Sequence, residues 1–215
     1  MLANKTRIRD GRGRQRKRVL EARKAPGQAR AKETVNIILE ASARILESEG
    51  LRGFNTNSVA AKAGVSVGSL YQYFPNKDAI LMALIERFED AAQEAINEAL
   101  LSAKGRPLKP SLRLFVRALV EAHFSRPKLN RLLEAEEERL GGGSVDFAFH
   151  PGLQDLLQEH RREVAQAVTN ASERVGMAIL RAVIDQALAL AGSPRSVEQD
   201  ALRAVTGFLL YRESR

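Results

Sequence analysis

Side chains that could contact DNA are concentrated in one short segment, AGVSVGSLYQYFPNK, at residues 63–77. Two of the three tyrosines of the chain lie in it, together with a glutamine and a lysine. Their hydroxyl, amide and ammonium groups suit hydrogen bonds and ion pairs with the bases and phosphates of a duplex. A segment this short is a poor helix on its own, so neighbouring elements must hold it in place.

The pattern of small, flexible and aliphatic residues predicts a helix-turn-helix motif over residues 55–74. Ala60 is a small residue at the position where two short helices would cross. Gly64 can adopt the left-handed backbone conformation that the turn between them needs. Leu70 is placed to pack the second helix back against the first. These three requirements are met at the correct spacing, so the two helices are expected to form one unit.

Residues that can cap helices precede each element of this region. Asn55 or Thr56 can accept a hydrogen bond from the free backbone N–H groups of the first short helix, and Ser66 can do so for the second. Asn76 can cap a long helix that follows. The caps therefore support the same boundaries as the apolar pattern.

A recognition helix places the side chains of its first turns in the major groove, so its outward residues are the candidate DNA contacts. Phe74 and Leu70 are expected to face inward and anchor it. Gln72 can pair with adenine and Val67 can touch a thymine methyl group. Lys77 begins the next helix, where the helix dipole already favours a phosphate. The expected DNA-binding residues are Thr56, Asn57, Ser66, Val67, Gly68, Ser69, Tyr71, Gln72, Tyr73 and Lys77.

Two of these residues also have a purely structural interpretation. Tyr71 could pack mainly in the protein core, and Asn57 could act only as a helix cap. The sequence leaves both alternatives open.

The stretch TNSVAAKAGVSVGSLYQYFPNKDAIL resembles the DNA-binding segment of the tetracycline-repressor (TetR) family of bacterial transcription regulators. The detailed resemblance covers residues 32–92, and beyond them only the general helical plan matches. It implies an all-α fold, with an N-terminal three-helix helix-turn-helix domain followed by a helical ligand-binding and dimerisation domain. It also implies a homodimeric repressor that binds a palindromic DNA operator and is released by an unknown small-molecule effector.

Apolar residues recur at helical spacing from about residue 31 onward, and no useful segment has the period of a strand. The expected domains are 1–31, a basic and disordered extension; 32–92, the DNA-binding domain; and 93–215, the second domain.

The last two expected helices, at about 177–191 and 197–212, are apolar on more than one face. They could form half of a four-helix bundle shared by two subunits, or both could pack inside one subunit. Ser196 and Gln199 are expected to form a capping box at the start of the second helix.

Positive charge is concentrated in the first 30 residues, which hold eleven Lys or Arg and two acidic residues, a balance of +9. Since the whole chain carries +8, the remainder is close to neutral, at −1. Such a tail attracts polyanions, nucleic acid first among them. It could equally be a solvated extension, or reflect a start codon assigned too early. An effector-independent regulator or architectural protein that uses this tail is therefore an alternative function.

Histidine and phenylalanine side chains on apolar helical faces of the second domain are candidates for a ligand pocket. His123 and His160 could contact a ligand, or could be hydrogen-bonded core residues; His150 falls in an expected loop. The acidic run EAEEER, at residues 134–139, is expected to be a solvated helix face. The candidate pocket residues are Phe115, His123, Phe124, Phe147 and His160.

Several other functions are not supported by the sequence. No His, Asp and Glu spacing suits a metal ion, and no nucleophile has a recognisable base partner. We therefore predict no metal, no cofactor and no catalytic residue, with an unrecognised enzyme as a remote alternative. The chain has no cysteine, no apolar run long enough to span a bilayer and no secretory signal, which favours a cytoplasmic protein without a membrane partner.

Overall fold

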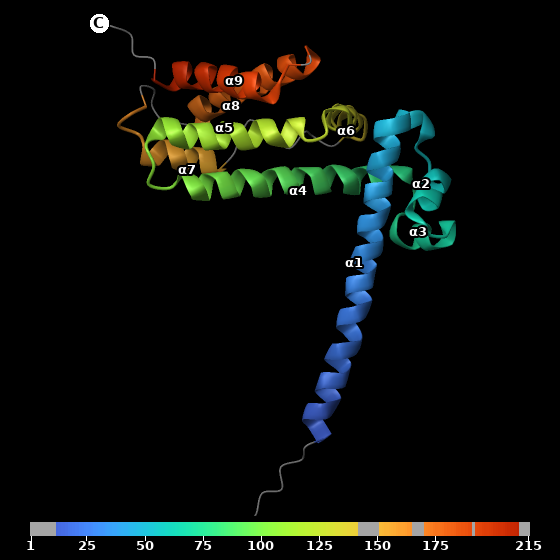
Figure 1. Cartoon of the computed structure of the whole chain (residues 1–215). Coiled ribbons are helices and arrows are strands. Elements are labelled where there is room, and N and C mark those ends of the chain that lie inside the picture. Colours follow the sequence, from blue (N-terminus) through green and yellow to red (C-terminus); the bar gives the residue numbers. More distant parts are fainter. Residues whose placement is uncertain (1–11, 142–150, 165–169, 191, 211–215) are drawn as a thin grey trace, which may run out of the picture.

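The computed structural model describes residues 12–141, 151–164, 170–190 and 192–210, and every regular element within these ranges is an α-helix (Figure 1). The predicted all-α fold is confirmed. The helices are α1 (Arg12–Gly53), α2 (Thr56–Ala63), α3 (Val67–Tyr73), α4 (Lys77–Ala103), α5 (Leu108–Phe124), α6 (Pro127–Arg139), α7 (Pro151–Glu159), α8 (Asn170–Ala189) and α9 (Pro194–Leu210).

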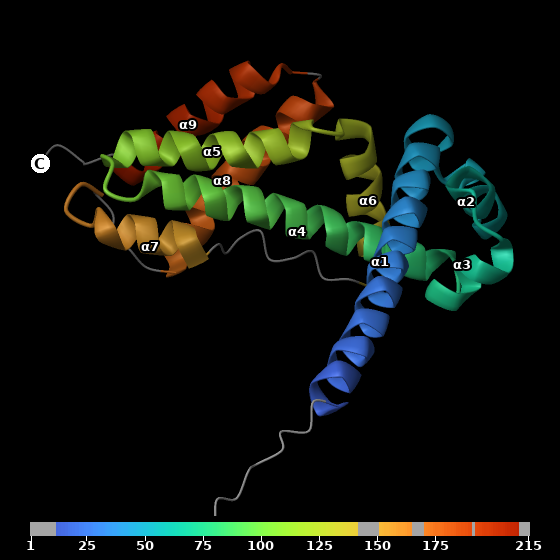
Figure 2. The ribbon, with the colours of Figure 1, turned by 60° about the horizontal axis from the view of Figure 1, so that its bottom comes forward.

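Two hydrophobic cores divide the helices into two groups, and α4 runs through both (Figure 2). The first core joins α1, α2, α3 and the first half of α4. The second core joins α5, α7, α8, α9 and the later part of α4, where Ile96 is buried. Leu129 and Leu133 of α6 lie in the first core, although α6 follows α5 in the chain. Helix α6 is thus attached to α1 and α4 rather than only to its neighbours in sequence.

Two arginines at the ends of α6 add ion pairs to this attachment. Arg126, directly before α6, donates from Nε to Glu47 of α1 over 2.7 Å and lies 5.8 Å from the ring centre of Phe88. Arg139, the last residue of α6, donates to Asp78 of α4 over 2.8 Å. The hydrogen bond from Arg126 lowers the pKa of Glu47, which therefore stays ionised in this setting.

Helix α1 extends further toward the N-terminus than the sequence pattern indicated. It begins at Arg12, so residues 12–31 are helical where a disordered extension was expected, and residues 1–11 lie outside the described part. Its first half projects away from the other helices in both views (Figures 1 and 2).

The start of α9 also differs from the prediction. The helix begins at Pro194, and the hydroxyl of Ser193 accepts a hydrogen bond from the backbone N–H of Ser196 over 3.2 Å. Ser193 is therefore the capping residue, and the expected capping box from Ser196 to Gln199 is wrong. Proline is favoured in the first turn of a helix because its missing N–H needs no partner there.

Candidate nucleic-acid interface

The start of α2 is fixed by Asn55. Its Oδ1 accepts hydrogen bonds from the backbone N–H groups of Asn57 and Ser58 over 3.1 and 3.0 Å. The Ser58 hydroxyl in turn accepts from the Asn55 backbone N–H over 3.2 Å, which completes a capping box. Asn55, not Thr56, is thus the cap. Asn57 does not have this role, and its exposed side chain is available for a contact with DNA.

The turn between α2 and α3 depends on Gly64, which has φ 68° and ψ 28°. Val65 then donates its backbone N–H to the carbonyl of Ala60 over 3.0 Å, and Ala60 is buried where the helices meet. Ser66 caps α3 by accepting a hydrogen bond from the Ser69 backbone N–H over 3.0 Å. The short helices therefore have the crossing, turn and cap that the sequence predicted.

Helix α3 is anchored from one side by two buried residues. Leu70 is completely buried and Phe74 nearly so, and both belong to the first core with residues of α1, α2 and α4. Because α3 has only seven residues, this anchoring rather than its intrinsic helix propensity keeps it in place.

The opposite side of α3 presents large side chains to solvent. Val67, Tyr71 and Tyr73 are 37%, 50% and 36% exposed. Gly68 and Gln72 are exposed between them. A short helix with this much apolar and aromatic surface uncovered is typical of a surface that binds a partner.

Tyr71 connects the two short helices on this exposed side. Its hydroxyl lies 3.3 Å from the hydroxyl of Thr56 at the start of α2, within hydrogen-bond distance. A half-exposed ring does not fit the alternative in which Tyr71 packs mainly in the core. This contact places two candidate DNA-binding residues, one from α2 and one from α3, next to each other on the surface.

The charge of the surface also suits a polyanion. Residues 54–77 contain no Asp, Glu or His, and their two charged side chains are Lys62 and Lys77. Lys77 is exposed at the first position of α4, directly after the cap Asn76, which accepts from the Ala79 backbone N–H over 2.8 Å. Lys62, exposed in the last turn of α2, was not among the predicted contacts. The absence of acidic residues from the surrounding segment could have indicated from the sequence that Lys62 is a candidate contact.

Four of the five predicted pocket residues lie in the described part of the chain: Phe115, His123, Phe124 and His160. Phe115 is buried in the second core, and Phe124 packs against the same core. The Nδ1 atom of His160 lies 2.7 Å from the carboxylate of Glu163. Phe147, like His150, lies outside the described residues.

His123 does line a cavity of about 70 Å³ between α4, α5 and α6, although its Nδ1 atom also lies 2.8 Å from the Leu119 carbonyl oxygen. The other lining residues include Phe88, Glu89, Asn130 and Glu134. Burial raises the pKa of Glu134, and burial together with neighbouring carboxylates raises that of Glu89.

The glutamates of α6 correct an expectation from the sequence. The run at 134–139 is not a uniformly solvated face, because Glu136 is buried and pairs with Arg139 over 2.7 Å. Glu134 and Glu137 line the cavity beside α4 and α5. Nothing in the local sequence distinguished these positions from exposed glutamates.

Comparisons with known proteins agree with this geometry. Residues 38–84 match the family model described as bacterial regulatory proteins, tetR family. The nucleoid occlusion factor SlmA of Escherichia coli is 32% identical over 140 residues, which cover 61% of this chain and 70% of SlmA. The chain belongs to the TetR family. As a TetR-family protein it is a DNA-binding transcriptional regulator with a helix-turn-helix, and members of the family typically dimerise.

Solved structures of TetR-family proteins share this fold. A TetR-family transcriptional regulator from Mesorhizobium loti has a TM-score of 0.68 and 19% identity, covering 83% of this chain and 96% of its own. The regulator LfrR from Mycobacterium smegmatis, in complex with proflavine, has a TM-score of 0.53 and 18% identity, covering 83% and 98%. Within the described part of this TetR-family chain, no helix has both the length and the apolar character needed to cross a membrane.

Proposed function

We propose that this TetR-family regulator is a homodimeric repressor that binds a palindromic operator through α3 and is released by a small-molecule effector. The observation that carries the proposal is the acid-free outer side of α3, held by Leu70 and Phe74 with its polar and aromatic side chains exposed. This is the arrangement that a helix in the major groove requires.

The contacts divide into those that read bases and those that position the protein. Gln72 hydrogen-bonds an adenine edge, and Val67 touches a thymine methyl group. Gly68 has no Cβ and lets the backbone of α3 approach the DNA. Tyr73 and Lys77 bind phosphates and set the register of the helix in the groove. Thr56, Asn57, Ser66, Ser69 and Tyr71 complete the proposed set.

Dimerisation through α8 and α9 is supported by the outer side of α8. Val175 of α8 and Leu190, directly after its last residue, are 46% and 72% exposed, and the small residues Ala178 and Ala182 between them are exposed as well. A second copy that covers this side would bury both large side chains, and the small residues would allow close helix contact. Two subunits related by a two-fold axis would then present two α3 helices to two half-sites about 34 Å apart.

Effector release is supported by the position of α6. Helix α6 contributes Asn130 and Glu134 to the cavity with His123, and it contributes Leu129 and Leu133 to the first core. A molecule that enters and widens this cavity would displace α6 and, through the Arg126 and Arg139 ion pairs, also α1 and α4. The two α3 helices would then no longer match the spacing of the operator.

Selection of bound duplexes from a randomised pool, followed by footprinting, tests the DNA-binding part. Gln72→Ala is expected to change the preferred base at one position of each half-site. Lys77→Ala is expected to weaken all sequences alike and to reduce the salt slope by about one. Lys104→Ala, an exposed lysine just beyond the other end of α4, is the matched control. No preferred sequence, or equal affinity for all three variants, would refute the proposal.

A second candidate is an effector-independent DNA-binding protein. Two observations favour it: the relative SlmA is a nucleoid occlusion factor, and the cavity between α4, α5 and α6 is small. The basic residues at the N-terminus would then bind phosphates of the duplex. Deletion of residues 1–30 should flatten the plot of log K against log salt concentration, by about 0.9 for each phosphate that these residues neutralise. An unchanged slope would exclude this use of the tail.

A further inference from the structure

The cavity between α4, α5 and α6 is lined by acidic side chains. Glu89 of α4 and Glu134 and Glu137 of α6 line it, all three half-buried, and the described residues around it include no lysine or arginine. His123, when protonated, would offset one of these charges and leave the cavity negative. No residue of α8 or α9 lines the cavity, so it is not part of the proposed dimer contact.

The cations near this cavity pair with other carboxylates. Arg181 of α8 acts on Glu134, but its guanidinium pairs with Asp185 over 3.5 Å. Arg126 lies on the other side of α6 and pairs with Glu47 of α1. In the described part of the chain, none of the three lining glutamates forms an ion pair. The negative charge of the cavity is therefore unbalanced.

The three carboxylates also repel one another. Burial raises the pKa of Glu89 and of Glu134, and the nearby charge of Glu137 raises both further. Half-buried like charges without a counter-ion are unfavourable to the fold. A cation bound among them would remove this cost.

The rest of the lining suits the body of an organic cation. Phe88 and Leu133 supply apolar surface, and an aromatic ring also attracts a cation over its face. The Asn130 amide donates its N–H groups to the carbonyls of Ala122 and His123 over 3.1 and 2.9 Å, so its remaining polar atom is an acceptor oxygen. The cavity thus offers acceptors beside apolar walls, which complements a group rich in N–H donors.

The volume of the cavity limits the part of a molecule that it can enclose. It measures about 70 Å³. Because a water molecule takes about 30 Å³ in the liquid, a head group of about two or three non-hydrogen atoms fits. An ammonium-bearing carbon or an amidinium group has this size. The body of the molecule would extend from the cavity or widen it.

We propose that this cavity binds an organic cation, an amine or amidine whose N–H groups donate to the lining glutamates and whose apolar body lies on Phe88 and Leu133. As the class of the effector, such a cation rests on the proposed function, whereas its binding does not.

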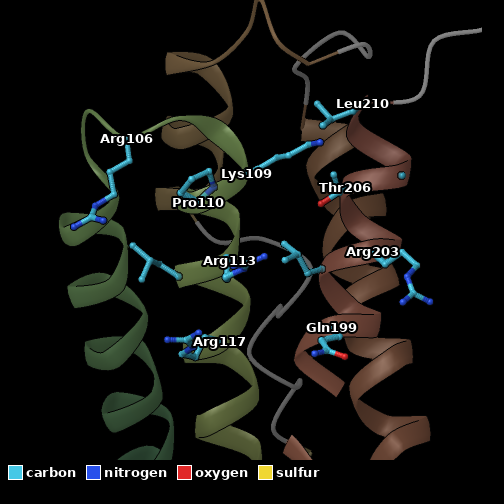
Figure 3. Close-up of a pocket in the computed structure, with 12 residues that line it drawn as sticks. Arg106, Lys109, Pro110, Arg113, Arg117, Gln199, Arg203, Thr206 and Leu210 are labelled. Carbon is cyan, nitrogen blue, oxygen red and sulfur yellow. The ribbon is translucent and has the colours of Figure 1, made fainter. Parts of the chain in front are cut away.

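Other occupants fit this cavity less well. In the part of the chain that the structure describes, no group of three or more His, Asp or Glu side chains is placed to hold a metal ion. An anion would be repelled. The larger groove between α5 and α9, of about 960 Å³, carries Lys109 and Arg113 on its α5 wall, and its α9 side belongs to the proposed dimer pair (Figure 3). A cation would therefore bind in the acidic cavity and not in that groove.

Calorimetric titration of the full-length protein without DNA tests the proposal. The probe is benzamidine, and the control is benzamide, which has the same ring and nearly the same shape but no charge. Sodium chloride keeps the ionic strength equal in both titrations. We expect benzamidine to bind at least about tenfold more tightly, because only its head group forms charge-assisted hydrogen bonds with the carboxylates.

Matched variants locate the binding site. Glu89→Gln with Glu134→Gln should weaken benzamidine by about tenfold or more, whereas Glu94→Gln with Glu138→Gln, the same charge change at exposed positions of the same helices, should not. Without ligand, the first pair should also raise the melting temperature above that of the second, since it relieves repulsion. Ala92→Leu should weaken benzamidine without any change of charge, because Ala92 lines the cavity.

Three results would overturn the proposal. The first is equal affinity for benzamidine and benzamide. The second is equal affinity of the two paired variants for benzamidine. The third is displacement of benzamidine by magnesium chloride at constant ionic strength, which would assign the carboxylates to a metal ion.

A separate measurement distinguishes this proposal from effector release. Benzamidine is added to the complex of the protein with its selected duplex, and anisotropy of the labelled duplex reports dissociation. Binding of benzamidine with unchanged duplex affinity would refute release while confirming the ligand class. Sequence-specific duplex binding by a protein that does not prefer benzamidine to benzamide would refute the ligand class alone.

Discussion

The same substitution at two glycines of the helix-turn-helix should have opposite effects on stability. Gly64 has φ 68°, and an alanine there is strained by about 1–2 kcal/mol. Restriction of the unfolded chain offsets about 0.4–1 kcal/mol of this, so Gly64→Ala should be destabilising by roughly 1 kcal/mol. Gly68 lies in α3 with ordinary helical geometry, and an added Cβ would meet only the Ser66 hydroxyl at 3.9 Å. Gly68→Ala should therefore be stabilising by about 0.5 kcal/mol.

Urea unfolding of the two variants at one protein concentration measures this difference, because dimerisation would otherwise shift both values. We expect the free energies of unfolding to differ by about 1–2 kcal/mol. Gly64→Asn should fall between Gly64→Ala and the unaltered chain, since asparagine tolerates the left-handed conformation. If Gly64→Ala proved as stable as Gly68→Ala, the turn would not require glycine and our account of its geometry would be incorrect.

Three further predictions concern the same region and its attachment to α6. Asn55→Ala should lower the free energy of unfolding by about 1 kcal/mol through loss of the α2 cap, and Asn57→Ala should not; chemical denaturation distinguishes them. Leu70→Ala should cost about 2.7–5 kcal/mol in the same assay and abolish DNA binding, because it empties a fully buried position. The pKa of Glu47 is lowered in the fold, so its ion pair with Arg126 stabilises the protein at pH values above the ordinary glutamate pKa of 4.5, and this stabilisation is lost as the pH falls below that value. Arg126→Met should therefore reduce the dependence of the free energy of unfolding on pH, measured between pH 3 and 6.

Local signals made the helix-turn-helix predictable from the sequence. The caps at Ser66 and Asn76, the turn at Gly64 and the buried Leu70 each involve residues within a few positions of one another. Backbone preference and helical spacing are properties of such short stretches, so one sequence is enough to locate them. The assignment of particular DNA contacts goes further than these signals and stays a prediction.

The features that the sequence did not reveal depend on distant residues. Arg126 pairs with Glu47 across 79 positions of the chain, and neither residue has a local pattern that names its partner. Glu134 and Glu137 look like other surface glutamates until α4 and α5 are placed beside α6. The start of α9 was misplaced because Ser193 and Ser196 are both acceptable caps, and Pro194 decided between them.

The composition of the proposed DNA-binding surface also bears on how operator binding could be regulated. Residues 54–77 contain no histidine, aspartate, glutamate or cysteine. Histidine is the side chain that most often makes an interface respond to pH near neutrality. The segment thus lacks the residue type on which such pH-dependent switches are usually built.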